Sequence, residues 1–513
     1  MKRKIFSILF TLVLVLSFSL VTAVPVMANT DRLVPSQYAT IQLAIDAADP
    51  GDTIIVAAGD YNEVVNIYKS NLVVKSASGA EVTTIVAASA VATVDFIGAS
   101  PEFGLVENSV LDGFTVINEF MGGPFPVVVR FQHASGCVAK NNVIIGPSTD
   151  TVPHMSGVVM SGEHNATINN ILENSTISNC WNGFVVFGPG ADGNTIRNNI
   201  VEENSNGAWI EYETKNTVVQ GNDIINNILL GIGIDEQYWN PSVNILINYN
   251  NIYGNGFGIK ADYQVLTTPV NATHNWWDDA SGPEDTTGTN EVPPCTADPT
   301  TEINADGIGD EVSDNVDYCP WLVGRVIGGK TETTQTDDPD TVDATTEADV
   351  KVIKRGEGTP TITVAEYEDN PGDGFTGDIG KYIDVHIDDD TNVTEIEIWL
   401  YYTDDEIEGL NEASLKLYWW DGSAWTECSD SGVNPDDTNS YSGYIWAKIR
   451  TDTNPTLDDL TGTPFGGGRP PVVGGTVYPI DKVSIVMPWI GLAVALALAG
   501  VFGARLAHRK LRG

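Results

Sequence analysis

The chain of 513 residues carries 69 acidic and 26 basic residues, which gives a net charge of −43 at pH 7. This acidic excess argues against a nucleic-acid-binding protein, because such proteins present a basic surface to the phosphates. The length exceeds what one compact core usually holds, so we expect two or three structural units.

The first 28 residues have the pattern of a secretory signal peptide. Three basic residues at positions 2–4 precede an apolar run over residues 5–21, and residues 26–28 read Val-Met-Ala, a small-x-small cleavage pattern. We therefore predict a signal peptide over residues 1–28 and a mature chain that begins at Asn29. An uncleaved N-terminal membrane anchor is the alternative.

A short amphipathic helix is predicted at residues 38–48. Thr40 suits the N-cap, and Ile41, Ala44, Ile45 and Ala48 share one face. Residues 50–52, Pro-Gly-Asp, end the helix, and residues 53–57 are predicted to form a strand. A helix of this kind can cover the exposed apolar end of a stack of strands.

Two residue patterns then repeat together about every 25 residues. An Asn or Asp stands two residues before a β-branched or aromatic residue at Asp112, Asn141, Asn169, Asn198, Asn222, Asn250 and Asn275. A glycine ladder accompanies it at Gly157, Gly183, Gly207, Gly231 and Gly256. One period shared by two patterns indicates a solenoid in which stacked coils pair corner amides along the stack. We predict a right-handed parallel β-helix over residues 29–323.

Alignment of the coils on the glycine ladder predicts a candidate site. It places Glu211, Asp235 and Lys260 at one equivalent position, four residues after their glycines. Carboxylates one strand spacing apart suit a retaining glycosidase or a Ca²⁺ site. The aromatic residues that we expect nearby to stack on sugar rings are Trp181, Trp209, Tyr212, Tyr238 and Trp239. The alternative is an ordinary solvated ladder of charges, and a register slip of one residue would turn each side chain to the other face.

Five cysteines leave at least one unpaired. Cys295 and Cys319 flank a polar loop, and we predict a disulfide between them. Cys137 and Cys180 lie within the repeats as possible small core residues, and Cys428 stands alone in the later part of the chain. No cysteine spacing resembles a zinc site.

The remainder of the chain divides into five predicted segments. Residues 324–349 form an acidic, Thr/Asp-rich linker, and residues 350–463 alternate polar and apolar residues, as is typical of an antiparallel β-sandwich. A Gly/Pro stalk follows at 464–482, then an apolar transmembrane helix at 483–504 and a basic cytoplasmic tail at 505–513. The predicted fold class is therefore all-β, with a signal segment and one C-terminal membrane span.

The repeat region resembles a known superfamily. Four features are similar to those of pectin-lyase-like β-helices. They are the opening at residues 38–48, the Gly-Asp-Thr-Ile stretch that starts at Gly51, the Asn and Gly ladders, and the Asn-Trp-Trp…Ser-Gly-Pro ending at 275–283. More narrowly, they resemble NosD-type and carbohydrate-binding or sugar-hydrolase β-helix regions. The resemblance implies the β-helix fold but no single activity, because the superfamily includes lyases, esterases, glycosidases, epimerases, adhesins and scaffolds. Residues 95–98 resemble part of a pectin methylesterase motif, but its companion motifs are absent.

The NosD-type resemblance also suggests a role in copper handling. His154, Met155, Met160 and His164 fall within eleven residues and include the soft ligands that copper prefers. Scattered surface residues are the simpler interpretation. The sequence does not identify a cofactor. Apart from copper, Ca²⁺ is the metal that the acidic composition suggests.

These observations favour a cell-surface, membrane-anchored protein that binds polysaccharide or other envelope components without catalysis. One alternative is a polysaccharide-active enzyme, either a lyase, an esterase or a glycoside hydrolase, that uses the acidic ladder at Glu211 and Asp235. A second alternative is NosD-like copper handling. Nucleic acid is not an expected partner.

Overall fold

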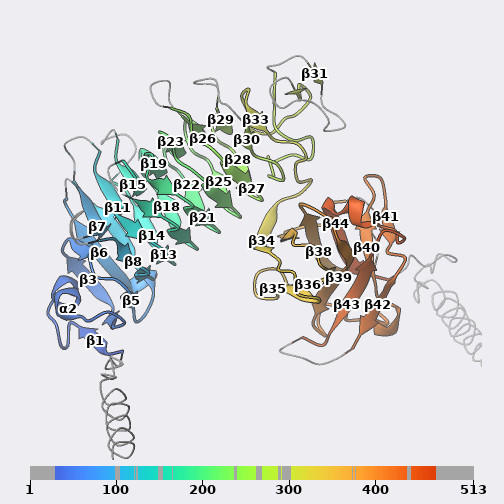
Figure 1. Cartoon of the computed structure of the whole chain (residues 1–513), viewed down its shortest axis with the longest axis horizontal. Coiled ribbons are helices and arrows are strands. Elements are labelled where there is room, and N and C mark those ends of the chain that lie inside the picture. Colours follow the sequence, from blue (N-terminus) through green and yellow to red (C-terminus); the bar gives the residue numbers. More distant parts are fainter. Residues whose placement is uncertain are drawn as a thin grey trace, which may run out of the picture.

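The computed structural model describes residues 29–469, apart from residues 90, 99–103, 121, 123–124, 148–153, 164–165, 236–239, 262–268, 287–289, 292–301, 373, 376 and 436–440. These residues form a parallel β-helix followed by a unit of two antiparallel sheets (Figure 1). This architecture confirms the predicted all-β fold with a parallel β-helix and a separate antiparallel unit. The predicted signal peptide (1–28), membrane span (483–504) and basic tail (505–513) lie outside the described residues. No helix among the described residues is long and apolar enough to cross a membrane.

Most coils of the β-helix contribute one strand to each of three long parallel sheets of 11, 8 and 8 strands, and some coils add a strand to a short fourth sheet of 4 strands. Sheet 1 contains β1 (Asp31–Val34), β2 (Thr53–Val56), β5 (Val73–Ser76), β9 (Val110–Asp112), β13 (Val138–Lys140), β17 (Ile171–Glu173), β21 (Thr195–Arg197), β24 (Val218–Gln220), β27 (Leu246–Asn248), β30 (Val270–Asn271) and β33 (Val316–Asp317). Sheet 2 contains β3 (Gly59–Asn62), β6 (Thr83–Ala87), β10 (Thr115–Asn118), β14 (Val143–Ile145), β18 (Thr176–Ser178), β22 (Ile200–Glu202), β25 (Asp223–Ile225) and β28 (Asn251–Tyr253).

Sheet 3 contains β4 (Val65–Ile67), β7 (Ala92–Ile97), β11 (Val127–Gln132), β15 (Ser156–Ser161), β19 (Asn182–Phe187), β23 (Asn206–Glu211), β26 (Leu230–Ile234) and β29 (Ile259–Lys260). Sheet 4 contains β8 (Val106–Glu107), β12 (Ala134–Ser135), β16 (Thr167–Ile168) and β20 (Ala191–Asp192). A two-stranded pair, β31 (Asn290–Glu291) and β32 (Glu302–Ile303), and the 3₁₀ turn η1 (Ala80–Val82) complete this unit. One continuous apolar core runs through the coils, from Val34 to Cys319.

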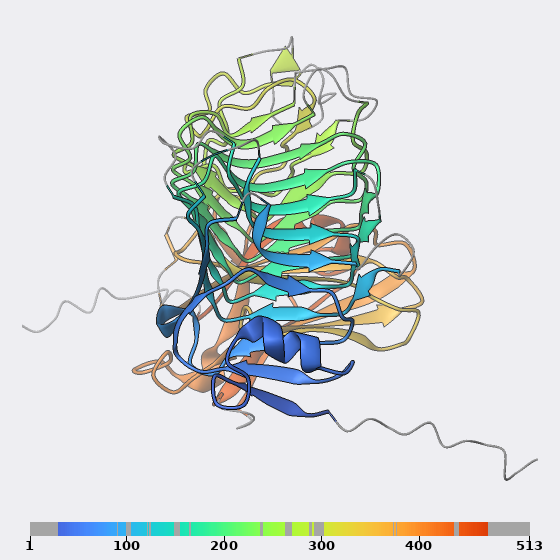
Figure 2. The ribbon, with the colours of Figure 1, turned by 90° about the vertical axis from the view of Figure 1, so that its left-hand side faces the viewer.

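Helix α2 (Ile41–Ala47) lies at the N-terminal end of the stack (Figure 2). The Thr40 side chain caps it by accepting a hydrogen bond from the backbone N–H of Leu43, and Ile41, Ala44 and Ile45 are fully buried. This arrangement confirms the predicted helix, its cap and its apolar face. The helix covers core residues that would otherwise face water at the first coil.

Buried asparagines join the coils at the corner between sheets 1 and 2. Asn199, Asn222, Asn250 and Asn275 form a column in which each side-chain N–H donates to the next Oδ1 at 2.9–3.0 Å. The predicted amide ladder therefore exists, but the sequence repeat mixes non-equivalent positions. Asn141 and Asn198 lie one residue before the column, where the backbone has positive φ, and Asn169 precedes a strand of sheet 1 at another corner. Asparagine suits both environments, because it tolerates the left-handed conformation and has donor and acceptor atoms to stack.

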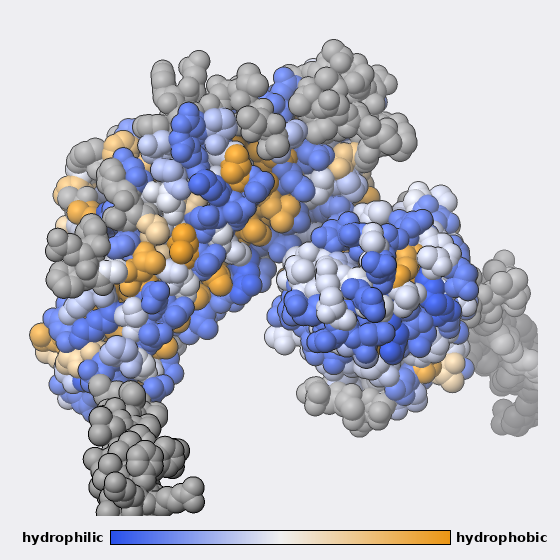
Figure 3. Space-filling model, viewed as in Figure 1, coloured by the Kyte–Doolittle hydropathy of each residue, from blue (hydrophilic) through white to orange (hydrophobic). Residues whose placement is uncertain are grey.

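The second unit, which we call the sandwich, packs two antiparallel sheets around one core. Sheet 5 contains β34 (Val326–Thr333), β37 (Thr361–Tyr367), β38 (Asp378–Ile387), β44 (Thr461–Gly468), β40 (Lys416–Trp420) and β41 (Trp425–Glu427). Sheet 6 contains β35 (Asp340–Ala344), β36 (Val350–Gly356), β39 (Val393–Tyr402), β43 (Gly443–Ile449) and β42 (Ser431–Asn434). Two 3₁₀ turns, η2 (Glu412–Ser414) and η3 (Leu457–Asp459), connect strands. In Figure 3, hydrophilic residues cover most of the visible surface of both units, and apolar patches interrupt them on the coils.

Two predicted segment boundaries are wrong. Residues 324–349 are not a linker, because β34 and β35 are edge strands of sheets 5 and 6. The Gly-rich residues 466–468 belong to β44 inside sheet 5 rather than to a stalk, and the rest of the predicted stalk, 470–482, lies outside the described residues. Glycine is needed there because a Cβ on Gly466 would lie 2.9 Å from the Phe375 ring, and one on Gly467 would lie 2.8 Å from Ile379 and Ile445.

Candidate functional site

The outer face of sheet 3 holds most of the aromatic residues that the sequence singled out. Side chains alternate along each strand, so Phe184 and Val186 of β19 face the core while Val185 and Phe187 face outward. The same alternation turns Trp209 of β23 outward, in register with Val185. Trp181 directly precedes β19 and Tyr212 directly follows β23. We call Phe125, His154, Trp181, Phe187, Trp209 and Tyr212 together the aromatic surface.

Three rings of the aromatic surface form a row at the start of the sheet 3 strands. Phe125, His154 and Trp181 come from successive coils, with ring centroids 5.5 Å apart for the first pair and 5.6 Å for the second. Phe125 is 70% exposed, although phenylalanine is usually buried. An exposed row of rings, one per coil, is a surface on which an elongated ligand can lie along the stack.

The other rings lie further along the strands. The rings of Phe187 and Tyr212 pack at 5.2 Å between centroids. The Trp209 indole lies against Gly233 of the next coil, since a Cβ built at Gly233 would be 2.7 Å from the ring. Glycine at this position therefore allows the indole to lie against the sheet.

The predicted register of Glu211 and Asp235 is confirmed, because Ile210 and Ile234 directly before them are paired, but Asp235 does not lie in an open ladder of carboxylates. Asp235 is fully buried, and its carboxylate accepts hydrogen bonds from the backbone N–H of Tyr212 (3.1 Å) and from the backbone N–H (2.6 Å) and hydroxyl (2.9 Å) of Ser242. Burial raises the pKa of Asp235, partly offset by these hydrogen bonds. Its described contacts are those of a loop-fixing residue, not of one side of an open carboxylate pair with Glu211.

Lys260 is displaced from its predicted position. It pairs in register with Gly233 and not with Asp235, because Gly258, rather than Gly256, is equivalent to Gly231. The Lys260 ammonium lies over the Phe257 ring, 4.7 Å from the centroid. The prediction placed this coil two residues out of register.

The four predicted copper ligands do not come together in the described residues. Met155 and Met160 are each 1% exposed and belong to the apolar core of the β-helix. His154 is exposed and packs between Phe125 and Trp181, and His164 lies outside the described residues. No cluster of three or more His, Cys, Asp or Glu side chains that could hold a metal ion occurs in the described part of the chain. Asp310 accepts hydrogen bonds from the backbone and side chain of Asn255.

Three other predicted residues, Tyr238, Trp239 and Cys295, lie outside the described residues. Cys319 is disulfide-bonded, whereas Cys137, Cys180 and Cys428 are buried free thiols. Burial raises the pKa of Cys137 to about 11 and that of Cys180 to about 12, so both remain protonated and unreactive at neutral pH. The pairing of Cys319 with Cys295 stays a prediction.

Sequence reasoning missed an ion pair on the same face of sheet 3. Arg130 of β11 binds Asp95 of β7 through both Nε (3.1 Å) and Nη2 (2.5 Å), and the two residues are in register. Asp95 is 4% exposed, and burial raises its pKa against the lowering effect of Arg130. Because the two residues are 35 positions apart, only the correct coil register could have paired them.

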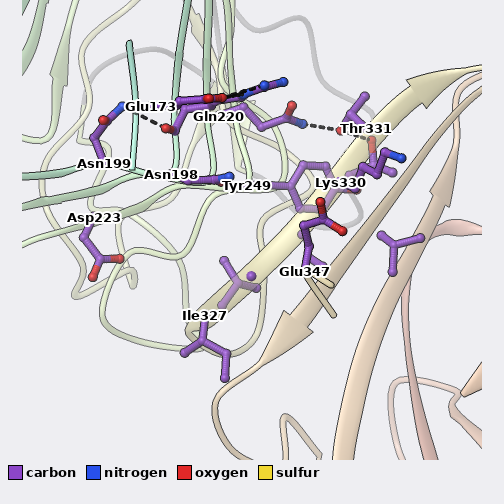
Figure 4. A pocket seen from close by; sticks show the side chains of 18 of the residues that line it. Glu173, Asn198, Asn199, Gln220, Asp223, Tyr249, Ile327, Lys330, Thr331 and Glu347 are labelled. Atoms are coloured by element: carbon purple, nitrogen blue, oxygen red, sulfur yellow. Dashed lines mark hydrogen bonds and ion pairs between the residues drawn. The ribbon is translucent and has the colours of Figure 1, made fainter. Parts of the chain in front are cut away.

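A concave region lies between the β-helix and the sandwich. A cavity of about 800 Å³ is lined by corner residues of sheets 1 and 2 on one side and by β34 on the other (Figure 4). Its charged side chains are largely paired, as Arg197 with Glu173 at 2.6 Å and Arg325 with Asp223 at 2.7 Å. Gln220 donates to Thr331 across the gap. This polar crevice is best explained as a seam between the two units.

Beside the crevice, the two units share a buried contact. The His274 ring of the β-helix lies 5.4 Å from the Tyr249 ring and 4.5 Å from the His386 ring of the sandwich, and its Nε2 lies 2.8 Å from the Thr461 carbonyl oxygen. Asp384 is fully buried next to them and accepts a hydrogen bond from the Tyr367 hydroxyl at 2.8 Å. Burial raises the pKa of Asp384 to about 7, while burial and the neighbouring His386 lower the pKa of His274 to about 4.

Comparison with known proteins supports the fold. Residues 127–292 match the family model of the right handed beta helix region. No curated protein sequence matches the chain. Together with the parallel sheets, this match supports a right-handed parallel β-helix in this part of the chain.

Solved structures similar to this chain include an alginate lyase from Paenibacillus sp. str. FPU-7, with 16% identity, coverage of 56% of this chain and 99% of that chain, and a TM-score of 0.39. The mannuronan C-5 epimerase AlgE6 A-module of Azotobacter vinelandii has 18% identity, coverage of 46% and 71%, and a TM-score of 0.30. A pectin methylesterase from carrot has 14% identity, coverage of 45% and 85%, and a TM-score of 0.23. Likeness at these levels concerns the fold alone and carries no argument about activity.

Proposed function

We propose that this protein binds polysaccharide through the aromatic surface of sheet 3 and does not cleave it. The observation that carries the proposal is the gathering of Phe125, His154, Trp181, Phe187, Trp209 and Tyr212 on one outward face. Aromatic rings offer flat apolar area, and the C–H face of a pyranose ring packs against such area. The exposed Phe125–His154–Trp181 row runs along the stack, which matches the long axis of a polymer better than the shape of a small ligand.

Binding is favoured over catalysis by the state of the acidic residues. Asp235, the intended partner of Glu211, is buried and accepts three hydrogen bonds from Tyr212 and Ser242. General acid–base catalysis needs a carboxyl group within reach of the substrate. A lyase, esterase or glycoside hydrolase is therefore the less favoured function.

On this proposal the protein is exported and displayed at the cell surface. The signal-like residues 1–28 and the apolar residues 483–504 would place residues 29–482 outside the membrane. The net charge of −43 suits a hydrated surface layer, in which polysaccharide or other envelope components are the partners.

A glycan array probed with the full-length protein, with and without Ca²⁺, tests the proposal. We expect Trp181→Ala and Trp209→Ala each to weaken binding about tenfold, because each removes one stacking ring. Gly233→Ala should weaken binding without removing a ring, since its Cβ would stand 2.7 Å from the Trp209 indole and displace it. Trp420→Ala, a half-buried tryptophan of sheet 5 outside the aromatic surface, is the matched control.

Two outcomes would contradict the proposal. Equal binding by the Trp420→Ala, Trp181→Ala and Trp209→Ala proteins would show that the aromatic surface is not the site. Release of shortened glycan that stops in Glu211→Gln or Asp235→Asn would show that the protein is an enzyme. An effect of Ca²⁺ on binding alone would add a metal requirement and leave the proposed surface intact.

A further inference from the structure

The outer face of sheet 6 carries a second group of aromatic residues, on the sandwich. In β39 and β43, Ile398, Leu400, Ile445 and Ala447 face the core. The alternating residues Trp399, Tyr401, Tyr444 and Trp446 therefore face outward; Tyr401 is buried against Tyr441, and the other three are half-buried. We call these four residues the sandwich platform. An outward sheet face normally carries polar residues, so four large aromatic residues here require an explanation.

The rings of the sandwich platform form a packed cluster, in which Trp399 and Tyr444 stack on each other and the Tyr401 ring is tilted by 57° to that of Tyr444. Trp399 is paired in register with Trp446, and Tyr401 with Tyr444, across adjacent strands. Trp399 and Tyr444 stack diagonally with centroids 4.3 Å apart and planes 16° apart. The Trp446 indole lies over Gly432 of β42, where a Cβ would be 2.7 Å from the ring. Glycine at position 432 thus allows the ring cluster to extend over the neighbouring strand β42.

Polar contacts hold these rings in place. The Trp399 indole N–H donates to the Glu397 carboxylate at 2.9 Å, and Asn434 Nδ2 donates to the Tyr444 hydroxyl at 2.7 Å. The Lys351 ammonium lies 5.9 Å from the Trp399 ring centroid. A ligand that stacks on rings already fixed in this way loses little conformational entropy from the protein on binding.

The charges around the platform are balanced. Lys351 lies 3.1 Å from Asp343, Lys448 lies 3.6 Å from Glu397, and Arg450 lies 2.9 Å from Glu395. The chain as a whole carries −43 and repels polyanions at low ionic strength. A surface that carries aromatic rings and is locally neutral therefore fits an uncharged ligand.

The contacts that the described residues make between the two units do not involve the platform. The β-helix contacts Thr461, His386 and Thr331, which belong to sheet 5. Sheet 6 forms the other layer of the sandwich and lies below sheet 5 in Figure 1, whereas the last coils of the β-helix lie above it.

We propose that the sandwich platform is a second carbohydrate-binding site, which takes a neutral polysaccharide whose sugar rings pack against the outward parts of Trp399, Tyr444 and Trp446. The site is separate from the aromatic surface of sheet 3. It gives the sandwich a function of its own, whether or not sheet 3 binds sugar.

Depletion of the full-length protein from solution by insoluble cellulose, chitin and mannan tests the proposal, with alginate gel as the acidic probe. We expect at least one neutral polymer to deplete the protein. Trp399→Ala should weaken that binding about tenfold, whereas Trp420→Ala should leave it unchanged. Trp209→Ala serves to separate the two sites, because it removes a sheet 3 ring and keeps the platform.

Gly432→Ala is a second test of the platform, in case Trp399→Ala weakens binding only because the protein misfolds. Its methyl group displaces the Trp446 indole from the sheet and removes no ring, so neutral-polymer binding should also weaken while the near-ultraviolet circular dichroism of the other tryptophans persists. The proposal is wrong if no neutral polymer depletes the wild-type protein, or if alginate alone depletes it. It is equally wrong if Trp399→Ala and Gly432→Ala bind as well as Trp420→Ala.

Discussion

Replacement of Asn222 by alanine tests how the coils are joined, because Asn222 occupies the middle of the buried asparagine column. Its Oδ1 accepts from the backbone N–H (2.9 Å) and side chain (3.0 Å) of Asn199. Its Nδ2 donates to Asn250 Oδ1 (2.9 Å) and to the carbonyl oxygens of Ile196 (2.9 Å) and Gln220 (3.1 Å). Alanine removes all these bonds from a side chain that is fully buried.

The cost follows from the groups that lose their partners. The Asn199 side chain keeps its bonds to the Leu172 and Arg197 carbonyl oxygens, but the backbone N–H of Asn199 loses its acceptor in the interior. An unsatisfied buried donor costs about 1–3 kcal/mol, and each of the other lost bonds contributes about 1 kcal/mol. We expect a local destabilisation of about 3–5 kcal/mol.

Hydrogen–deuterium exchange read by mass spectrometry measures this effect where it arises. A loss of about 3 kcal/mol corresponds to exchange faster by more than a hundredfold, which we expect for the amide of Asn199. The coils around β2 should stay protected, because each repeat contacts only its neighbours. Asn62→Ala, at an exposed strand position, is the control. Exchange at Asn199 within about threefold of wild type would refute the reasoning.

Three further predictions concern buried charges. Asp384→Asn removes a carboxyl group whose pKa is 3.8 in the unfolded chain and about 7 in the folded protein. The free energy of unfolding of the wild-type protein should therefore fall by about 4 kcal/mol relative to that of the variant as pH rises from 4 to 8. If urea titrations gave the two proteins the same pH dependence of stability, the prediction would be contradicted. His274→Gln removes an imidazole whose folded pKa, about 4, lies below the ordinary histidine value of 6.5. Wild-type stability should therefore fall as pH drops from 6.5 towards 4, and the variant should lack that loss in the same titration. Arg130→Leu leaves Asp95 buried without its bidentate partner and should cost about 3–5 kcal/mol. The more exposed pair Lys140–Asp112, 3.9 Å apart, supplies the control variant Lys140→Leu, and equal shifts of the two urea midpoints would show that burial is irrelevant.

The sequence was sufficient for the β-helix because its signals are local and repeated. The cap at Thr40 and the apolar face of α2 depend on neighbours within one turn, and the coil period is present many times. The phase of the repeat was harder to predict. Asn198 and Asn199 are adjacent asparagines with different roles, one in a positive-φ turn and one in the buried column, and composition does not distinguish them.

The edge strands and the unit contact could not be predicted for different reasons. Strand β34 is at the edge of sheet 5 and buries little, so its residues lack the apolar alternation that marks a central strand. Tyr249, His274 and Asp384 meet across more than 100 residues of chain, and no local pattern marks such a meeting. The site was mispredicted in part because Asp235 fixes a loop, a role that depends on Ser242 rather than on the coil register.

The two proposed carbohydrate surfaces make a joint prediction, since one chain presents them on different sheets. A ligand long enough to contact both would bind more tightly than either surface alone allows, by up to about 10²–10⁴-fold. A short oligosaccharide can occupy only one surface at a time, so its affinity for each should be independent of the other. We therefore expect Trp209→Ala and Trp399→Ala to act additively on oligosaccharide binding. On a polymer that both surfaces bind at once, either single substitution should remove most of the extra affinity that comes from binding at two surfaces. The double variant should then bind only a little more weakly than either single variant. Additive effects on such a polymer would show that the two surfaces never hold the same strand.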